Sequence, residues 1–117
     1  METPEDVQKA VVQLIATKPV GARLALIGGF RLRHLDGSCR RSNDVDYHTG
    51  DDLRAVAGDL ASTLSRTFLP LARNRSGWKG DVGDQVHPAA YSPFVQQVTL
   101  RLWRDAGPAI ELPIEVT

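Results

Sequence analysis

The sequence has a single cysteine, no long hydrophobic run and no net charge, and each of these absences excludes a class of protein. Cys39 is the only cysteine, so neither an internal disulfide nor a cysteine-rich zinc site can form. No apolar run approaches the ~20 residues that a membrane-spanning helix needs. Residues 1–8 are polar and acidic, unlike a secretory signal. We therefore expect a cytoplasmic protein that has no membrane partner.

Charge is informative in its distribution rather than in its sum. The 14 basic and 14 acidic side chains cancel, so the protein as a whole is not expected to attract nucleic acid. Between Arg23 and Arg41 the chain holds five arginines against one acidic residue, Asp36, whereas five aspartates follow between Asp44 and Asp59. Such adjoining blocks suit a site that binds both phosphates and a metal ion, although a solvated surface of uneven charge gives the same pattern.

The length of 117 residues, with 42% hydrophobic and 24% charged residues, predicts one soluble globular domain over residues 1–117. Two helices are predicted from capping boxes followed by apolar stripes. The first is capped by Thr3 and ends at Lys18-Pro19. The second covers 53–64 and is capped by Thr49, with Asp52 three residues on. We expect no regular helix after Pro70, but short strands or a functional loop around residues 78–82.

Strands are predicted at four places. The apolar run 24–27 is typical of a strand buried on both faces. Residues 43–48 alternate, which places Asp44 and Asp46 on one face of a strand. Residues 94–104 and 109–116 predict a hairpin, in which Pro113 suggests a sheet edge or an irregularity.

The predicted strands and turn bring together residues that can bind metal ions and phosphates. Asp44 and Asp46 lie ~7 Å apart along one strand face, where two carboxylates can share or bridge Mg²⁺ ions. A carboxylate from a neighbouring strand, Glu111 or Glu115, would complete a two-metal site. The turn at 28–29 (Gly-Gly) leaves backbone N–H groups open to phosphates. Three arginines nearby suit a triphosphate: Arg33, Arg40 and Arg41.

Two stretches of the chain resemble a known signature. The run 27–33 (Ile-Gly-Gly-Phe-Arg-Leu-Arg) and the run 40–47 (Arg-Arg-Ser-Asn-Asp-Val-Asp-Tyr) are similar to the motif of the nucleotidyltransferase superfamily, and most of all to AbiEii-type toxins. Those are the toxins of type IV toxin–antitoxin and abortive-infection systems. The resemblance implies an α+β fold, a mixed β-sheet flanked by α-helices. It further implies Mg²⁺ as cofactor, a nucleoside triphosphate as substrate, a tRNA 3′ end, other RNA or a protein hydroxyl as acceptor, and a cognate antitoxin as partner.

Carried over to this sequence, the resemblance assigns roles to eight residues. The catalytic and metal-binding set is Asp44, Asp46 and Glu115, and the nucleotide-binding set is Gly28, Gly29, Arg33, Arg40 and Ser42. Glu111 stays open as the third carboxylate. Family members usually continue with a helical region past that carboxylate, whereas this sequence stops at Thr117, so we expect a minimal or truncated catalytic domain.

Two hypotheses remain at this point. One is the Mg²⁺-dependent transferase, and the other is a non-catalytic nucleotide-binding or regulatory module with the same fold. The position of the third carboxylate relative to the aspartate pair discriminates between them. Trp78 and Tyr91 suit either base stacking or packing beneath a loop. Trp103 suits an interface, or a sheet face covered by a helix.

Overall fold

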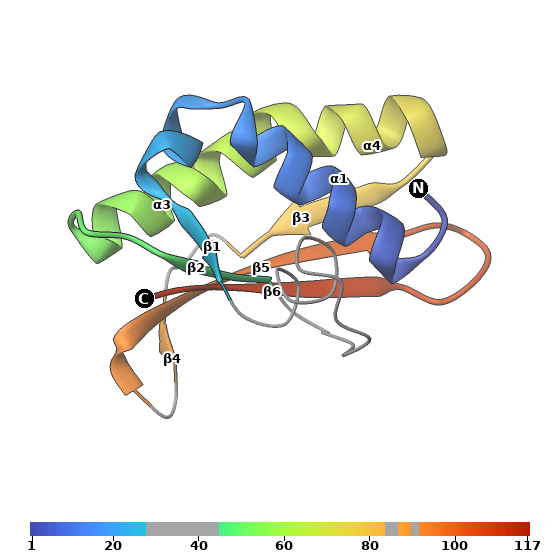
Figure 1. Ribbon diagram of the computed structural model, residues 1–117. Helices are drawn as coiled ribbons and strands as arrows, with labels where there is room; N and C mark the ends of the chain where they lie inside the picture. The colour runs from blue at the N-terminus through green and yellow to red at the C-terminus, as the bar shows by residue number, and fades with distance from the viewer. Residues whose placement is uncertain (28–44, 84–86, 90–91) are drawn as a thin grey trace.

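The computed structural model describes residues 1–27, 45–83, 87–89 and 92–117, and it has helices packed on one face of a mixed β-sheet (Figure 1). The predicted α+β class is confirmed. Helix α1 (Pro4–Ala16) begins at the predicted capping box. Its cap is reciprocal, since the Asp6 N–H donates to Thr3 Oγ1 and the Thr3 N–H donates to Asp6 Oδ2, both at 3.1 Å. Backbone hydrogen bonds from Glu2 and Thr3 lower the pKa of the Asp6 carboxyl.

A 3₁₀ turn, η1 (Pro19–Arg23), leads from α1 into the first strand. The second helix, α3 (Leu53–Thr63), begins three residues later than a Thr49 cap would require. Its cap is Asp52, whose Oδ1 accepts the Ala55 N–H at 2.8 Å, so the prediction of Thr49 as cap was wrong. The Thr49 hydroxyl instead accepts the N–H of Asp51. Both residue types cap well, and the backbone turn decides which one does so.

The second helix does not stop before Pro70, as the sequence had suggested. A π-helical turn, η2 (Leu64–Phe68), connects α3 directly to α4 (Leu69–Ser76), and we call the whole segment 53–76 the long helix. In the π turn the Leu69 N–H donates to the Leu64 carbonyl, five residues back. Pro70 then occupies the first turn of α4, a position at which a missing N–H costs little. Gly77, with φ +68°, ends the helix.

The sheet has the order β1-β2-β6-β5-β3, with β4 paired to β5. Its strands are β1 (Ala25–Ile27), β2 (Val45–His48), β3 (Lys79–Val82), β4 (His87–Ala89), β5 (Ser92–Trp103) and β6 (Ile110–Val116). Among the strands that the structure describes, β2 and β6 form the only parallel pair. The predicted hairpin is confirmed as β5–β6, and the short strand expected around 78–82 is β3.

The structure corrects the prediction of a strand buried on both faces at residues 24–27, and it excludes the edge position for residues 109–116, one of the two alternatives that Pro113 suggested. Strand β1 lies at an edge, and Ile27 is 38% exposed, so β1 is not buried on both faces. Strand β6 is central despite Pro113. The Thr117 N–H donates to the Tyr47 carbonyl, and the Thr117 carbonyl accepts from the Thr49 N–H. Backbone groups an even number of residues apart on a strand face the same neighbour, so the Pro113 nitrogen also faces the β2 side. In the part that the structure describes, β6 pairs with β2 from Ile114 onward. The missing N–H of Pro113 therefore interrupts none of the described pairing between the two strands.

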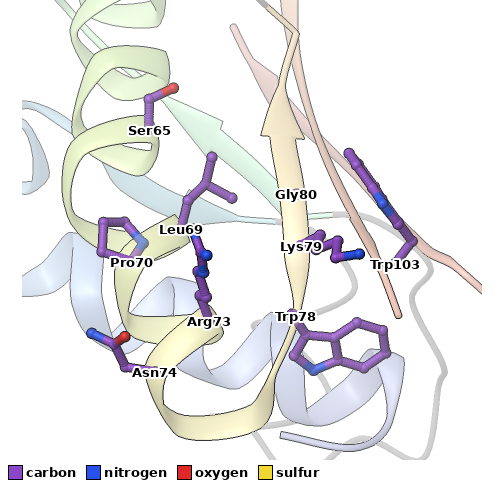
Figure 2. Close-up of a pocket in the computed structure, with 9 residues that line it drawn as sticks. All are labelled: Ser65, Leu69, Pro70, Arg73, Asn74, Trp78, Lys79, Gly80 and Trp103. Atoms are coloured by element: carbon purple, nitrogen blue, oxygen red, sulfur yellow. The ribbon is translucent and has the colours of Figure 1, made fainter. Parts of the chain in front are cut away.

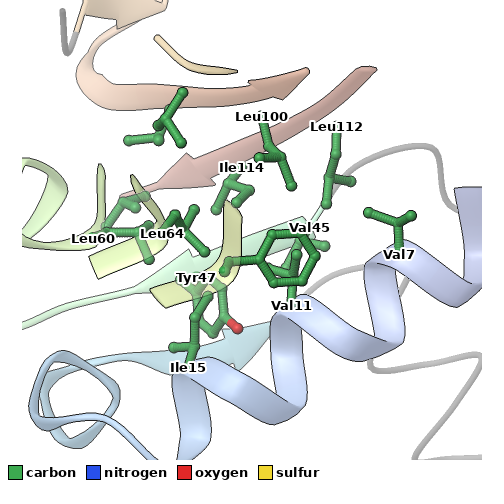
Figure 3. Packing of buried hydrophobic residues seen from close by; sticks show 14 of the residues in the cluster. Val7, Val11, Ile15, Val45, Tyr47, Leu60, Leu64, Leu100, Leu112 and Ile114 are labelled. Atoms are coloured by element: carbon green, nitrogen blue, oxygen red, sulfur yellow. The ribbon is translucent and has the colours of Figure 1, made fainter. Parts of the chain in front are cut away.

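The core lies between the helices and the sheet (Figure 3). Its fully buried side chains come from α1, the long helix, β2, β5 and β6, and the largest of them is Phe68. Tyr47 on β2 points toward α1 in Figure 3 and is 4% exposed. Its hydroxyl has no hydrogen-bond partner among the described residues, and burial raises its pKa because the phenolate is disfavoured.

Replacing Tyr47 by phenylalanine is expected to raise the free energy of unfolding by about 1 kcal/mol, because a buried hydroxyl without a partner carries a desolvation cost. Urea denaturation followed by circular dichroism measures the change. A loss of stability in Tyr47→Phe would show instead that the hydroxyl is hydrogen-bonded in the folded protein.

Candidate functional site

The face of the sheet opposite the helices, called the open face, carries three of the predicted acidic residues: Asp46, Glu111 and Glu115. Val45 and Tyr47 are buried beneath the helices, whereas Asp46 and the exposed His48 point the other way, as the alternation predicts. On β6, Glu111 and Glu115 likewise alternate with buried residues. Carboxylates from two strands therefore lie on one face of the sheet.

The register of β2 and β6 decides which glutamate is near Asp46. Asp46 and Glu115 are partners in the parallel pair, on strands that lie about 4.8 Å apart. Glu111 pairs with Arg101 of β5, and four residues along β6 separate it from Glu115, a distance of about 13 Å. Of the two glutamates that the sequence left open, the structure thus places Glu115 beside Asp46.

The remaining predicted site residues lie outside the described part of the chain. They are Gly28, Gly29, Arg33, Arg40, Ser42 and Asp44. Their roles stay predictions, as do those of Asp46 and Glu115 in binding metal. Within residues 1–27, 45–83, 87–89 and 92–117, no group of three or more His, Cys, Asp or Glu side chains is placed to bind a metal ion.

The pair Asp46–Glu115 nevertheless fits the chemistry of Mg²⁺. The ion prefers carboxylate and phosphate oxygens, and it is usually bound by one or two protein carboxylates together with substrate phosphates. Both side chains are partly exposed on the open face, where a substrate can approach them. The donor set is thus of the kind that Mg²⁺ takes when a nucleoside triphosphate supplies the other oxygens.

Gln97 is a site residue that the sequence analysis missed. It is the β5 partner of Glu115, in the antiparallel pair β5–β6. The Thr117 N–H donates to the Tyr47 carbonyl of β2. The backbone N–H and C=O groups of Glu115, two residues earlier, therefore also point toward β2 and away from β5. Gln97 and Glu115 therefore form a non-hydrogen-bonded pair, the arrangement in which cross-strand side chains are closest. The alternation of β5 could have indicated the face, but only the register places Gln97 beside Glu115.

Of the two tryptophans, Trp78 is buried and Trp103 is partly exposed. Trp78 is 2% exposed, its Nε1 donates to the Met1 carbonyl at 2.9 Å, and the Arg104 guanidinium lies 3.7 Å from the ring centroid. Trp78 is therefore a packing residue, which is one of the two roles that the sequence suggested for it. Tyr91 lies outside the described residues. Trp103 is 40% exposed, and no helix of the described part covers the open face. The expectation of a helix over Trp103 is therefore wrong for that part.

No helix in the described ranges is long and apolar enough to cross a bilayer. The fold itself is shared with two crystal structures of Helicobacter pylori proteins, one described as a proposed nucleotidyltransferase and one named JHP933. Each has a TM-score of 0.58 and 19% identity over 97% of this chain. No protein-family model and no curated protein sequence matches the chain.

The chain spans less than half the length of either neighbour, 43% of the first and 41% of the second. At 19% identity the likeness shows a common fold, which is nucleotidyltransferase-like. What the site does is a separate question, because one fold supports several functions.

Proposed function

We propose that this chain is the catalytic core of a Mg²⁺-dependent nucleotidyltransferase, which transfers a nucleotide from a nucleoside triphosphate to a hydroxyl group. The observation that carries the proposal is the register of Asp46 with Glu115 on the open face of a nucleotidyltransferase-like fold. The Asp-x-Asp signature at 44–46 supports it independently, since the signature belongs to the sequence and does not depend on the strand pairing.

In this proposal Asp44, Asp46 and Glu115 hold up to two Mg²⁺ ions. When bound, the ions stabilise the charge that develops on the transferring phosphate and on the departing pyrophosphate. Gly28 and Gly29 offer backbone N–H groups to the phosphates. Three further side chains orient the nucleotide by charge and hydrogen bonding: Arg33, Arg40 and Ser42. Gln97, beside Glu115, is in position to orient that carboxylate or a substrate hydroxyl.

The reaction forms one bond and breaks one. The acceptor hydroxyl oxygen bonds to the α-phosphorus, the bond from that phosphorus to the bridging oxygen breaks, and pyrophosphate leaves. The hydroxyl proton passes to water. We propose an RNA acceptor such as a tRNA 3′ end, with a protein hydroxyl as the second acceptor class, in an AbiEii-type cytoplasmic toxin that a cognate antitoxin restrains.

Nucleotide binding is tested by thermal unfolding with each nucleoside triphosphate, with and without Mg²⁺. A ligand at about 100 times its dissociation constant adds ~2.7 kcal/mol, which raises the melting temperature of a domain of this size by about 10 °C. We expect such a rise in the wild type with Mg²⁺ and no rise in Asp46→Ala. A rise that is equal in both proteins would contradict the role of Asp46.

A nucleotide-binding module without transfer activity is the alternative function. It would give the same Mg²⁺-dependent rise in melting temperature but no incorporation of a labelled nucleotide into RNA or protein. The two measurements together therefore separate the enzyme from the module.

A further inference from the structure

A groove lies between the long helix and strand β3, at the opposite end of the sheet from β1 (Figure 2). Its volume is about 650 Å³, within the ~300–1,000 Å³ of ligand pockets. Arg73 and Asn74 of α4 form one wall, Lys79 and Gly80 of β3 form the floor, and Trp103 of β5 lies at the far side. No carboxylate of the described residues lines this groove.

Gly80 allows close packing at the floor of the groove. A Cβ atom on Gly80 would come within 2.6 Å of Leu102 Cδ2, 2.7 Å of the Arg101 carbonyl oxygen and 2.9 Å of Leu69 Cδ2. The absence of that atom lets the long helix pack directly on β3 at Leu69. Leu69 also follows the π turn, a feature that is frequent at functional sites.

The charge of the groove is positive. Two basic side chains line it, Arg73 and Lys79, and no acidic residue occurs in the sequence between Asp59 and Asp81. Within the described part of the chain, Arg73 has no ion pair. Lys79 pairs with Asp105 at 3.2 Å, but the two side chains are 61% and 94% exposed, so the pair is weak and an anion can replace it. The groove therefore favours a negatively charged ligand.

The exposed indole indicates what kind of anion. Trp103 is the cross-strand partner of Lys79, and at 40% exposure it offers a ring surface next to a cation. Nucleobases stack on such rings while cations contact the phosphates, which is the combination that single-strand binding uses. An acidic peptide would use the cations but would gain nothing specific from the indole. Single-stranded nucleic acid is thus favoured over an acidic protein.

We propose that this groove binds the single-stranded end of an RNA, with Trp103 stacking a base and Arg73 and Lys79 contacting phosphates. The inference rests on the proposed function, because it assigns the surface that holds the acceptor. Trp103 and Gln97 lie on the same face of β5, six residues or about 20 Å apart, and Gln97 is beside Glu115. About six stacked nucleotides at ~3.4 Å each span that distance.

The test is fluorescence anisotropy with a labelled 12-nucleotide single-stranded RNA at several salt concentrations. We expect the wild type to bind with a dissociation constant of about 10⁻⁴ to 10⁻⁶ M. Trp103→Leu should weaken binding by about fivefold or more through lost stacking. Arg73→Ala should weaken it similarly and reduce the slope of log K against log salt by about one.

The matched control is Arg75→Ala, which removes the same charge from the same helix at an exposed position outside the groove. It should change the affinity by less than about twofold. Equal losses for Arg73→Ala and Arg75→Ala, or no effect of Trp103→Leu, would overturn the inference and leave a diffuse electrostatic surface. Displacement of the RNA by a glutamate 12-mer at equal concentration would overturn it in favour of an acidic protein partner.

The same variants separate this inference from the proposed function. Thermal unfolding with Mg²⁺ and nucleotide should be unchanged in Trp103→Leu and Arg73→Ala. RNA binding that depends on the groove, without any nucleotide transfer, would refute the transferase alone. Transfer to RNA that is indifferent to Trp103 and Arg73 would refute the groove alone.

Discussion

Glu115→Gln is expected to lower the rate of nucleotide transfer by about 100-fold or more. The substitution keeps the shape of the side chain and removes its charge, next to Asp46 on the parallel neighbouring strand. A bound metal stabilises transition-state charge by several kcal/mol, and each 1.36 kcal/mol is a factor of ten in rate. Incorporation of a labelled nucleotide into total RNA and into protein measures the effect.

Glu111→Gln is the matched control for this experiment. Glu111 lies on the same strand and the same face, but it pairs with Arg101 and not with Asp46. We expect its transfer rate to stay within about twofold of the wild type, since an exposed charge at that distance is screened. If Glu111→Gln abolished transfer and Glu115→Gln did not, the assignment of the third carboxylate would be reversed.

Phe68→Ala is expected to cost 3–5 kcal/mol of folding free energy. Phe68 is fully buried and lies in the π turn, where the long helix packs on the core. Its truncation removes the transfer free energy of a benzyl group and leaves a cavity, a loss of ~3–5 kcal/mol in typical cores. This is a large share of the ~5–15 kcal/mol that stabilises a domain. Urea denaturation measures the loss.

The exposed Arg66 in the same turn gives the control for Phe68. Arg66→Ala should change the free energy of unfolding by no more than about 0.5 kcal/mol, as exposed substitutions usually do. A cost below about 1 kcal/mol for Phe68→Ala would mean that the π turn is not packed as described here.

The sequence predicted those elements whose signals are local. The capping box at Thr3 and the alternation around Asp46 involve neighbours along the chain, and both predictions are confirmed. The second helix was predicted to end at residue 64, where its apolar stripe stops, whereas a π turn and the packing of Phe68 in the core carry the helix on to Ser76. Tertiary packing thus extends the helix beyond the segment that the local pattern predicts.

Strand pairing is the information that the sequence did not contain. Periodicity put Glu111 and Glu115 on one face, but it did not specify that β6 pairs in parallel with β2. Pro113 suggested an edge strand or an irregularity because it lacks an N–H, and whether that lack breaks a ladder depends on a pairing that the sequence does not specify. The choice of Glu115 over Glu111 follows from this pairing, and the approach of Gln97 follows from the register of β5 with β6.

The most direct test of the account is a crystal structure with a non-hydrolysable nucleoside triphosphate and Mn²⁺ in place of Mg²⁺. Anomalous scattering locates Mn²⁺ independently of the protein atoms. The account predicts a manganese peak between the carboxylates of Asp46 and Glu115, with triphosphate oxygens completing its coordination. A nucleotide bound elsewhere, or a metal that contacts neither carboxylate, would contradict it.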